Sequence, residues 1–195
     1  MLQKEKLLHL ANQNNGVLFT KIATDLGYHR ATIQDLVDDG KLIPVQRGIY
    51  VTENGYVDDF FLLGSKFRNG IFSHETALYL LGFSDRAPIR ITMTFLHGTS
   101  STRIKNNGVK PIMVTKDHTL GESSIQKNGL PLRVYEIERT LIDLLKPRYD
   151  TDMEQLIPAI KKYATYEKKD INKLFRYGRY FGLEEKIRNY MGVLL

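Results

Sequence analysis

Residues 19–38 read FTKIATDLGYHRATIQDLVD, and their spacing is the one that two closely crossing helices need. Ala23 is small, so a second helix can pass it closely, and Gly27, four positions later, tolerates the positive φ of a sharp turn. Ile33 and Leu36 follow ten and thirteen residues after Ala23 and would hold the second helix against the core. The pattern predicts a helix-turn-helix.

The second helix of this pair carries polar residues at the positions that do not face the core. These are His29, Arg30, Thr32 and Gln34. They lie at the N-terminal end, where a recognition helix meets base edges and phosphates. Arg30 and Gln34 are four residues apart, so both could reach the same groove, with Arg30 reading guanine and Gln34 reading adenine. Thr32 suits a phosphate contact.

The flanking segments extend this unit to a winged helix-turn-helix. We expect a helix over residues 2–14, a short helix capped by Thr20, a third helix over about 29–39, and strands over 42–45 and 49–51. The two strands flank a tight turn at Arg47-Gly48, where glycine can supply a positive φ. Phosphate or wing contacts are predicted for Thr20, Lys21, Lys41 and Arg47. A solvated turn is the alternative for Arg47.

The charge of the chain is unevenly distributed. The 195 residues are 42% hydrophobic, which excludes a disordered chain, and the net charge of +6 permits a polyanionic partner. Residues 1–57 carry six bases and six acids, so the whole surplus lies in residues 58–195. Asp35, Asp38 and Asp39 also crowd the far end of the recognition helix, so this unit by itself would bind DNA weakly.

A phosphate clamp in the second part of the chain could supply the missing attraction. The candidates are Arg90, Arg103, Lys105, Lys110 and Arg148. Each of them could instead belong to a solvated face.

A polar stretch with an Asn54-Gly55 turn marks the predicted boundary between a winged helix-turn-helix domain, residues 1–56, and a second domain, residues 57–195. The second domain is expected to combine a small sheet with a helical C-terminal part, so the fold class is α+β. Ser73 is the candidate N-cap of a helix over 74–81. Asn128-Gly129 predicts a hairpin between strands 124–127 and 130–135. Further strands are expected over 89–95 and 109–115, and further helices over 57–67, 136–145, 152–164, 169–180 and 184–191.

The residues offer little for catalysis or metal binding. The absence of Cys excludes disulfides, thiol nucleophiles and Cys-based zinc sites. The five His residues show no ligand spacing, and His74-Glu75 is not followed by the second His of a zincin. Arg139 and Asp143 stand four residues apart and are expected to pair with each other or to cap a neighbouring element. We therefore expect no metal, no cofactor and no enzymatic activity, and a nuclease whose site is not evident is an alternative.

The location of the chain follows from two further features. It has no run of 18 or more apolar residues, and its N-terminus lacks the layout of a signal peptide. We expect a cytoplasmic protein without membrane contact. The aromatic residues between the bases of the C-terminal tail are expected in the core rather than stacked on single-stranded RNA.

Three segments together resemble AbiEi-type antitoxins, the antitoxin halves of type IV, abortive-infection toxin–antitoxin pairs, which act in phage defence. Leu36-Val37-x-x-Gly40-x-Leu42 with Arg47-Gly48-x-Tyr50-Val51 resembles the N-terminal winged helix of that family. The segment 72–78 (FSHETAL) resembles its linker helix, and the segment 138–145 (ERTLIDLL) resembles its C-terminal signature.

The resemblance implies two activities in a bacterial cell. The winged helix would bind inverted repeats in the protein's own promoter and repress transcription, and the C-terminal domain would counter a co-encoded nucleotidyltransferase-like toxin without forming a stable complex. Inverted repeats imply two protein copies on double-stranded DNA, so we expect a free monomer or weak dimer that pairs on DNA. The alternative is a protein-interaction module that binds its toxin or another protein directly, without sequence-specific DNA binding.

Overall fold

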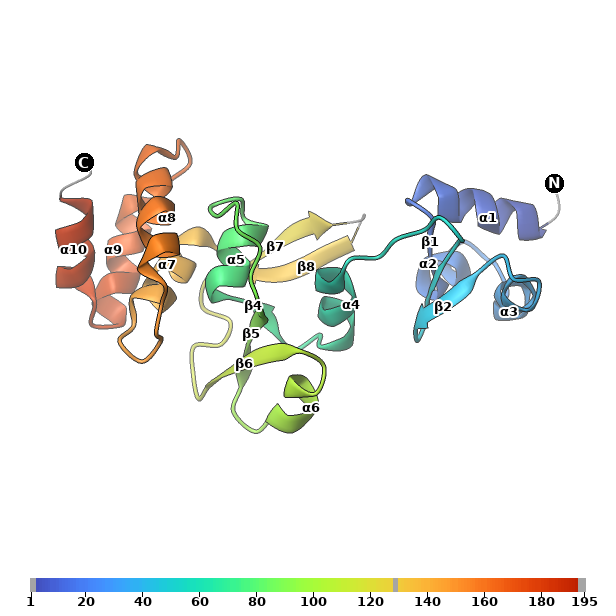
Figure 1. Cartoon of the computed structure of the whole chain (residues 1–195), viewed down its shortest axis with the longest axis horizontal. Coiled ribbons are helices and arrows are strands. Elements are labelled where there is room, and N and C mark those ends of the chain that lie inside the picture. Colours follow the sequence, from blue (N-terminus) through green and yellow to red (C-terminus); the bar gives the residue numbers. More distant parts are fainter. Residues whose placement is uncertain (1–2, 128–129, 193–195) are drawn as a thin grey trace. The chain divides into compact units, whose positions relative to one another are not determined.

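The computed structural model describes residues 3–127 and 130–192 and is a mixed α+β structure with a small sheet and C-terminal helices, as predicted (Figure 1). It divides into two compact units, residues 1–66 with 126–130, and residues 67–125 with 131–195. The first unit thus extends ten residues beyond the boundary expected after Tyr56, because Phe61 packs its ring 5.1 Å from that of Phe19. The predicted Asn128-Gly129 turn lies outside the described residues.

The first unit contains four helices and a three-stranded antiparallel sheet within its described part. In chain order the elements are α1 (Gln3–Gln13), β1 (Val17–Phe19), α2 (Thr20–Asp25), α3 (Arg30–Asp38), β2 (Ile43–Gln46), β3 (Ile49–Val51) and α4 (Asp59–Lys66). The strand order is β1-β3-β2, with Val17 opposite Val51. Strand β1 was not predicted, because three buried residues are too short to show an alternating pattern.

The predicted packing of α2 and α3 into one core is confirmed. Ala23, Ile33 and Leu36 are buried in one core cluster, and Gly27 adopts a φ of +86° in the turn between the two helices. The capping role predicted for Thr20 is wrong, since Thr20 is the first residue of α2 and Phe19 takes the cap position. The backbone N–H of Thr20 donates instead to the carbonyl of Gly48, 2.9 Å away, which ties α2 to the β2–β3 turn.

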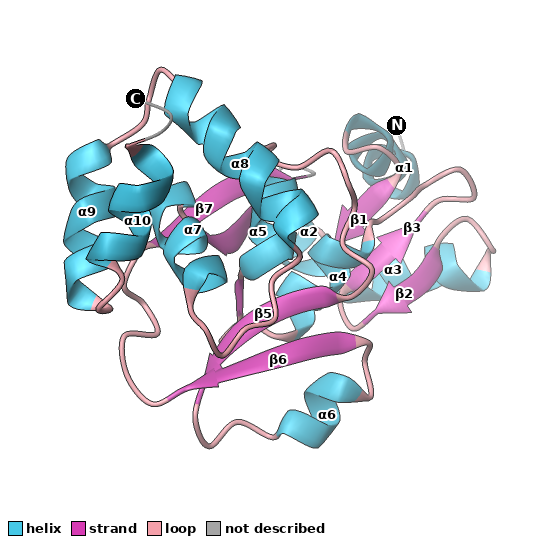
Figure 2. Ribbon diagram, turned by 60° about the vertical axis from the view of Figure 1, so that its left-hand side comes forward, coloured by secondary structure: helices cyan, strands magenta, loops and turns pink. Residues whose placement is uncertain are grey.

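The second unit is built around a five-stranded sheet with the order β6-β5-β4-β8-β7. Its elements are β4 (Ile71–Phe72), α5 (His74–Leu80), β5 (Ile91–Leu96), α6 (Ser101–Lys105), β6 (Val109–Val114), β7 (Glu122–Lys127), β8 (Leu130–Tyr135), α7 (Ile137–Leu145), α8 (Met153–Thr165), α9 (Ile171–Tyr180) and α10 (Glu184–Met191). Strands β5 and β6 run parallel, and α6 connects them. Helices α8 and α9 lie beside α7, and α10 packs against α8 and α9 (Figure 2).

Helix α7 lies at the centre of the second unit, with all nine of its residues buried. The predicted pairing of Arg139 with Asp143 is confirmed at 3.1 Å, and these side chains are only 2% and 3% exposed. The guanidinium also donates to the backbone carbonyls of Asp117 and Leu120, at 3.1 and 2.5 Å. Lys146 donates to the other oxygen of Asp143. The buried charge of Arg139 therefore has one carboxylate and two backbone carbonyls as partners.

The tyrosines of the C-terminal tail include two core residues. Tyr163 donates to Glu138 at 3.0 Å and Tyr177 donates to Glu136 at 2.7 Å. Burial and the neighbouring carboxylate raise the pKa of the Tyr163 hydroxyl, which keeps it a donor. For these two rings the expectation of a core position is confirmed, and they cannot stack on an RNA base.

Ser73 occupies the N-cap position of α5, but its side chain makes no capping hydrogen bond, so this part of the prediction is wrong. Its hydroxyl accepts from Thr94 at 2.9 Å and lies 3.0 Å from Nδ1 of His74. His74 is 3% exposed, has a φ of +55°, and packs its ring 4.3 Å from that of Tyr149. Burial lowers the pKa of His74 to about 4.

Among the described residues, none of the helices is both long enough and apolar enough to cross a lipid bilayer.

The buried imidazole of His74 should make folding pH-dependent. An unfolded chain takes up a proton near pH 6.5 and the folded chain only near pH 4, so stability falls as the pH drops through that window. Between pH 6.5 and 4, we expect the free energy of unfolding of the wild type to fall by up to about 3 kcal/mol more than that of His74→Asn. Asn accepts the left-handed backbone. Urea unfolding at several pH values measures this, and parallel pH profiles of the two proteins would contradict it.

Removal of the Arg139 side chain should be severely destabilising. Arg139→Ala leaves Asp143 buried with Lys146 as its remaining basic partner, and we expect the free energy of unfolding to fall by about 3–5 kcal/mol. Arg176→Ala, on the exposed face of α9, is the control and should change it by less than about 0.5 kcal/mol. Equal effects of the two substitutions in chemical denaturation would show that the buried network does not support the fold.

Candidate nucleic-acid interface

The exposed face of α3 carries two of the four predicted recognition-helix residues together. Arg30 and Gln34 are exposed and one helical turn apart, while Ile33 and Leu36 anchor the opposite face in the core. Thr32 is half-buried and, at 100° per residue, lies about 160° around the helix from Gln34. His29 is exposed at the N-cap position but makes no side-chain cap. Arg30 and Gln34 thus share a face that Thr32 does not.

Two of the three acids at the far end of α3 have partners. Lys4 of α1 pairs with Asp39 at 2.7 Å, and this contact raises the pKa of Lys4. The amide nitrogen of Gln34 donates to Asp38 at 2.9 Å. The sequence shows the surplus of acid on this helix but not how it is divided among partners.

The β2–β3 turn brings three of the predicted phosphate-contact residues together. Gly48 has a φ of +79°, as its place in the turn predicts, and its carbonyl accepts the N–H of Thr20. Arg47 next to Gly48 therefore lies at the start of α2, beside Thr20 and Lys21. Lys41 is not part of this group. It follows the C-terminal end of α3, about 13 Å along the helix from Arg30.

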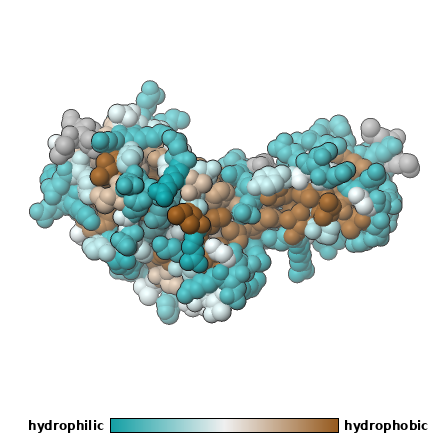
Figure 3. Space-filling view, viewed as in Figure 1, coloured by the Kyte–Doolittle hydropathy of each residue, from teal (hydrophilic) through white to brown (hydrophobic). Residues whose placement is uncertain are grey.

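A basic surface surrounds the β5–α6–β6 segment of the second unit. From Arg86 to Lys116 the chain holds six Lys or Arg and neither Asp nor Glu. Four of the predicted clamp residues belong to it: Arg90 before β5, Arg103 and Lys105 on α6, and Lys110 on the edge strand β6. All four are exposed, and none forms an ion pair within the described part of the chain. Figure 3 shows a hydrophilic surface over α6.

Arg148, the fifth predicted clamp residue, lies outside this segment, in the loop between α7 and α8. Its guanidinium lies 4.9 Å from the ring centre of Tyr149, which packs against His74. The charge of Lys110 acts on the imidazole of His74 and helps to lower its pKa.

Lys116, which is exposed just after β6, was missed. The run of 31 residues without an acid was the signal that could have found it.

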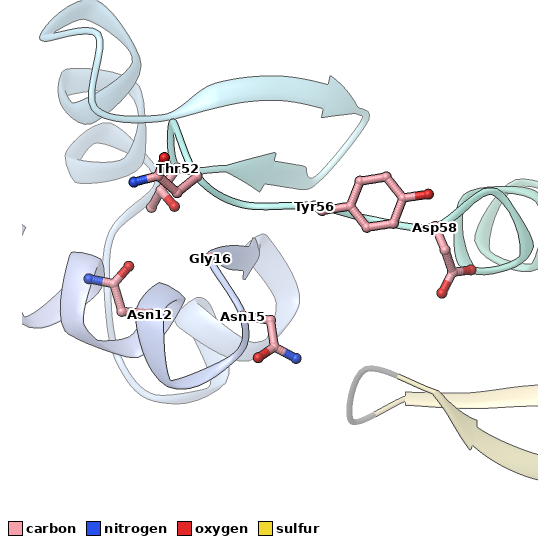
Figure 4. A pocket seen from close by; sticks show the side chains of 7 residues that line it. Asn12, Asn15, Gly16, Thr52, Tyr56 and Asp58 are labelled. Carbon is pink, nitrogen blue, oxygen red and sulfur yellow. The ribbon is translucent and has the colours of Figure 1, made fainter.

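A polar pocket of about 540 Å³ lies elsewhere in the first unit, where α1 ends (Figure 4). It is lined by Asn12, Asn15, Gly16, Thr52, Asn54, Tyr56 and Asp58. The lining contains one carboxylate and no base, so it does not suit a phosphate. In the described residues there is also no group of three or more His, Asp or Glu side chains that could hold a metal ion.

Comparison with known proteins bears on the fold only. No family model matches the chain, and no curated protein matches it. Among solved structures, the RV2827C protein from Mycobacterium tuberculosis is similar, with a TM-score of 0.56 and 14% sequence identity. The match covers 98% of this chain and 82% of the mycobacterial one. The arrangement of helices and strands is thus shared with a natural protein of very different sequence.

Proposed function

We propose that the chain is a bacterial, cytoplasmic DNA-binding repressor of its own promoter and the antitoxin of a type IV toxin–antitoxin pair. The observation that carries the DNA-binding part is the exposed Arg30–Gln34 face of α3 together with a turn bearing Arg47 that is hydrogen-bonded to the start of α2. Helix, sharp turn, helix and two-stranded turn, in this order, are the parts of a winged helix-turn-helix.

In this proposal α3 enters the major groove and the rest of the surface holds phosphates. Arg30 donates two hydrogen bonds to guanine, and Gln34 contacts the neighbouring base pair. Thr20, Lys21 and Arg47 contact the backbone beside the groove. Because the first unit has no net charge, the basic surface of β5–α6–β6 supplies the remaining phosphate attraction.

The antitoxin part of the proposal rests on the resemblance to AbiEi-type antitoxins. The ERTLIDLL segment, residues 138–145, forms the buried centre of the second unit, so in this protein it has a structural role. Two copies would occupy the two halves of an inverted repeat. The functional partner is a nucleotidyltransferase-like toxin that is countered without a stable complex.

One observation favours the alternative of a protein-interaction module. The edge strand β2 exposes apolar side chains, since Ile43 is 51% and Val45 is 43% accessible. An exposed edge strand of this kind can pair with another chain. The alternative predicts that the toxin and this chain elute together in gel filtration at physiological salt, whereas the proposed function predicts separate elution.

Loss of the recognition side chains should abolish sequence-specific binding. For Arg30→Ala combined with Gln34→Ala, we expect affinity for the upstream promoter fragment to fall at least about 30-fold, towards that for unrelated DNA. The control, Lys6→Ala with Gln3→Ala on α1, removes the same types of group elsewhere and should bind like the wild type. A gel shift with the full chain measures both, and intact operator binding by the first variant would contradict the role of α3.

Removal of the basic surface should weaken binding to all DNA sequences alike. With Arg90, Arg103, Lys105 and Lys110 all changed to Ala, the slope of log affinity against log salt should become shallower by up to about 3.6. The matched control removes the same amount of positive charge from the C-terminal helices and the loop between them. It changes four exposed bases to Ala: Lys161, Lys162, Lys168 and Arg176. Salt titration of the gel shift separates the two. Equal slopes for both variants would show that β5–α6–β6 does not hold phosphates.

A further inference from the structure

Helix α3 presents a row of three polar side chains along one flank. Arg30, Gln34 and Asp38 follow one another at intervals of four residues, and all three are exposed. The row therefore runs from a cation through an amide to an anion. An acid at the last residue of a helix interacts unfavourably with the helix dipole. The presence of Asp38 is therefore not explained by the stability of α3.

The hydrogen bond between Gln34 and Asp38 determines which way the amide faces. The nitrogen Nε2 of Gln34 lies 2.9 Å from Oδ1 of Asp38. An ionised carboxylate only accepts hydrogen bonds, so the NH₂ group of Gln34 must face Asp38 and the carbonyl oxygen Oε1 must face the other way. A flipped amide would place two acceptor oxygens against each other.

This orientation has a consequence for base reading. A free glutamine amide can donate to guanine or thymine and can accept from adenine or cytosine, because it carries both kinds of group. With one N–H of Nε2 held by Asp38, the amide cannot turn over, so Oε1 stays on the side away from Asp38 and only the second N–H remains to donate. In the major groove, amino groups that donate to an acceptor are N6 of adenine and N4 of cytosine.

We propose that Asp38 is a positioning residue for sequence recognition. It holds the amide of Gln34 in one orientation, with Oε1 as the acceptor, so Gln34 favours a base that carries an amino group, adenine or cytosine, over guanine and thymine. This inference rests on the proposed function, because it requires α3 to lie in the major groove. The negative charge of Asp38 opposes DNA binding, but its hydrogen bond to Gln34 contributes to the choice of sequence.

Asp35 provides a matched control on the same helix. It is exposed and carries the same charge as Asp38, and no hydrogen bond joins it to Gln34 within the described residues. Removal of either acid should strengthen binding to all DNA, since one repulsion with the phosphates is lost. Only removal of Asp38 should change the base preference. Asp38→Glu keeps a carboxylate at this position and should retain the preference.

The experiment selects binding sites for the full chain from a pool of random duplexes. Comparison of the wild type with Gln34→Ala identifies the base pair whose preference depends on Gln34. Affinities for the four versions of that base pair are then measured by competition for the wild type, Asp38→Ala, Asp38→Glu and Asp35→Ala. Thermal unfolding followed by circular dichroism checks that each variant is folded.

We expect the wild type, Asp38→Glu and Asp35→Ala to prefer adenine or cytosine over guanine and thymine by at least about fivefold. For Asp38→Ala the preference should fall below about twofold, because the amide is then free to turn. A wild-type preference for guanine or thymine, an unchanged preference in Asp38→Ala, or a selected site with no position that depends on Gln34 would overturn this inference and leave the proposed function standing. Failure of the wild type to select any sequence would overturn the proposed function and this inference with it.

Discussion

The buried guanidinium of Arg139 is the constraint on which the second unit depends. It is held by the carboxylate of Asp143 and by two backbone carbonyls of the loop after β6, and it lies against the rings of Tyr135 and Phe181. A charge without partners in this interior would be costly. The guanidinium has its partners only when α7, this loop and the end of α9 are placed as they are in the structure. The loop must also come close to the arginine. Gly121 has a φ of +75°, and a Cβ there would lie 2.6 Å from that of Arg139.

The first unit faces a different problem, which is electrostatic. In the proposed function α3 must bind DNA although it carries three acids at one end and its unit has no net charge to attract phosphate. The structure divides the acids between partners, with Asp39 on Lys4 and Asp38 on Gln34. Exposed pairs of this kind contribute little to stability. Lys4 offsets the charge of Asp39, and Asp38 orients the polar side chain of Gln34.

Sequence patterns were reliable where the structure is local. Apolar spacing located α3, because a helix repeats every 3.6 residues. Glycine marked its stop and the turn at Gly27, because few other residues accept a positive φ. Strands β1 and β4 and the short helix α6 were missed, since two to five residues are too few to show a period. Ser73 and Thr20 stand at or next to the expected helix starts, but their hydrogen bonds are made elsewhere, with Thr94 and with the carbonyl of Gly48.

The sequence by itself determined the α+β class, the helices around Gly27, the pairing of Arg139 with Asp143 and the basic excess after residue 57. These follow from spacing and composition, which act within a few residues or over the whole chain. Only the tertiary structure decided that the β2–β3 turn is hydrogen-bonded to the start of α2, that the loop after β6 supplies two carbonyls to Arg139, and that the amide of Gln34 faces Asp38. Such facts depend on side-chain directions and on contacts between distant segments. A linear pattern does not encode them, because many arrangements satisfy the same spacing until packing selects one.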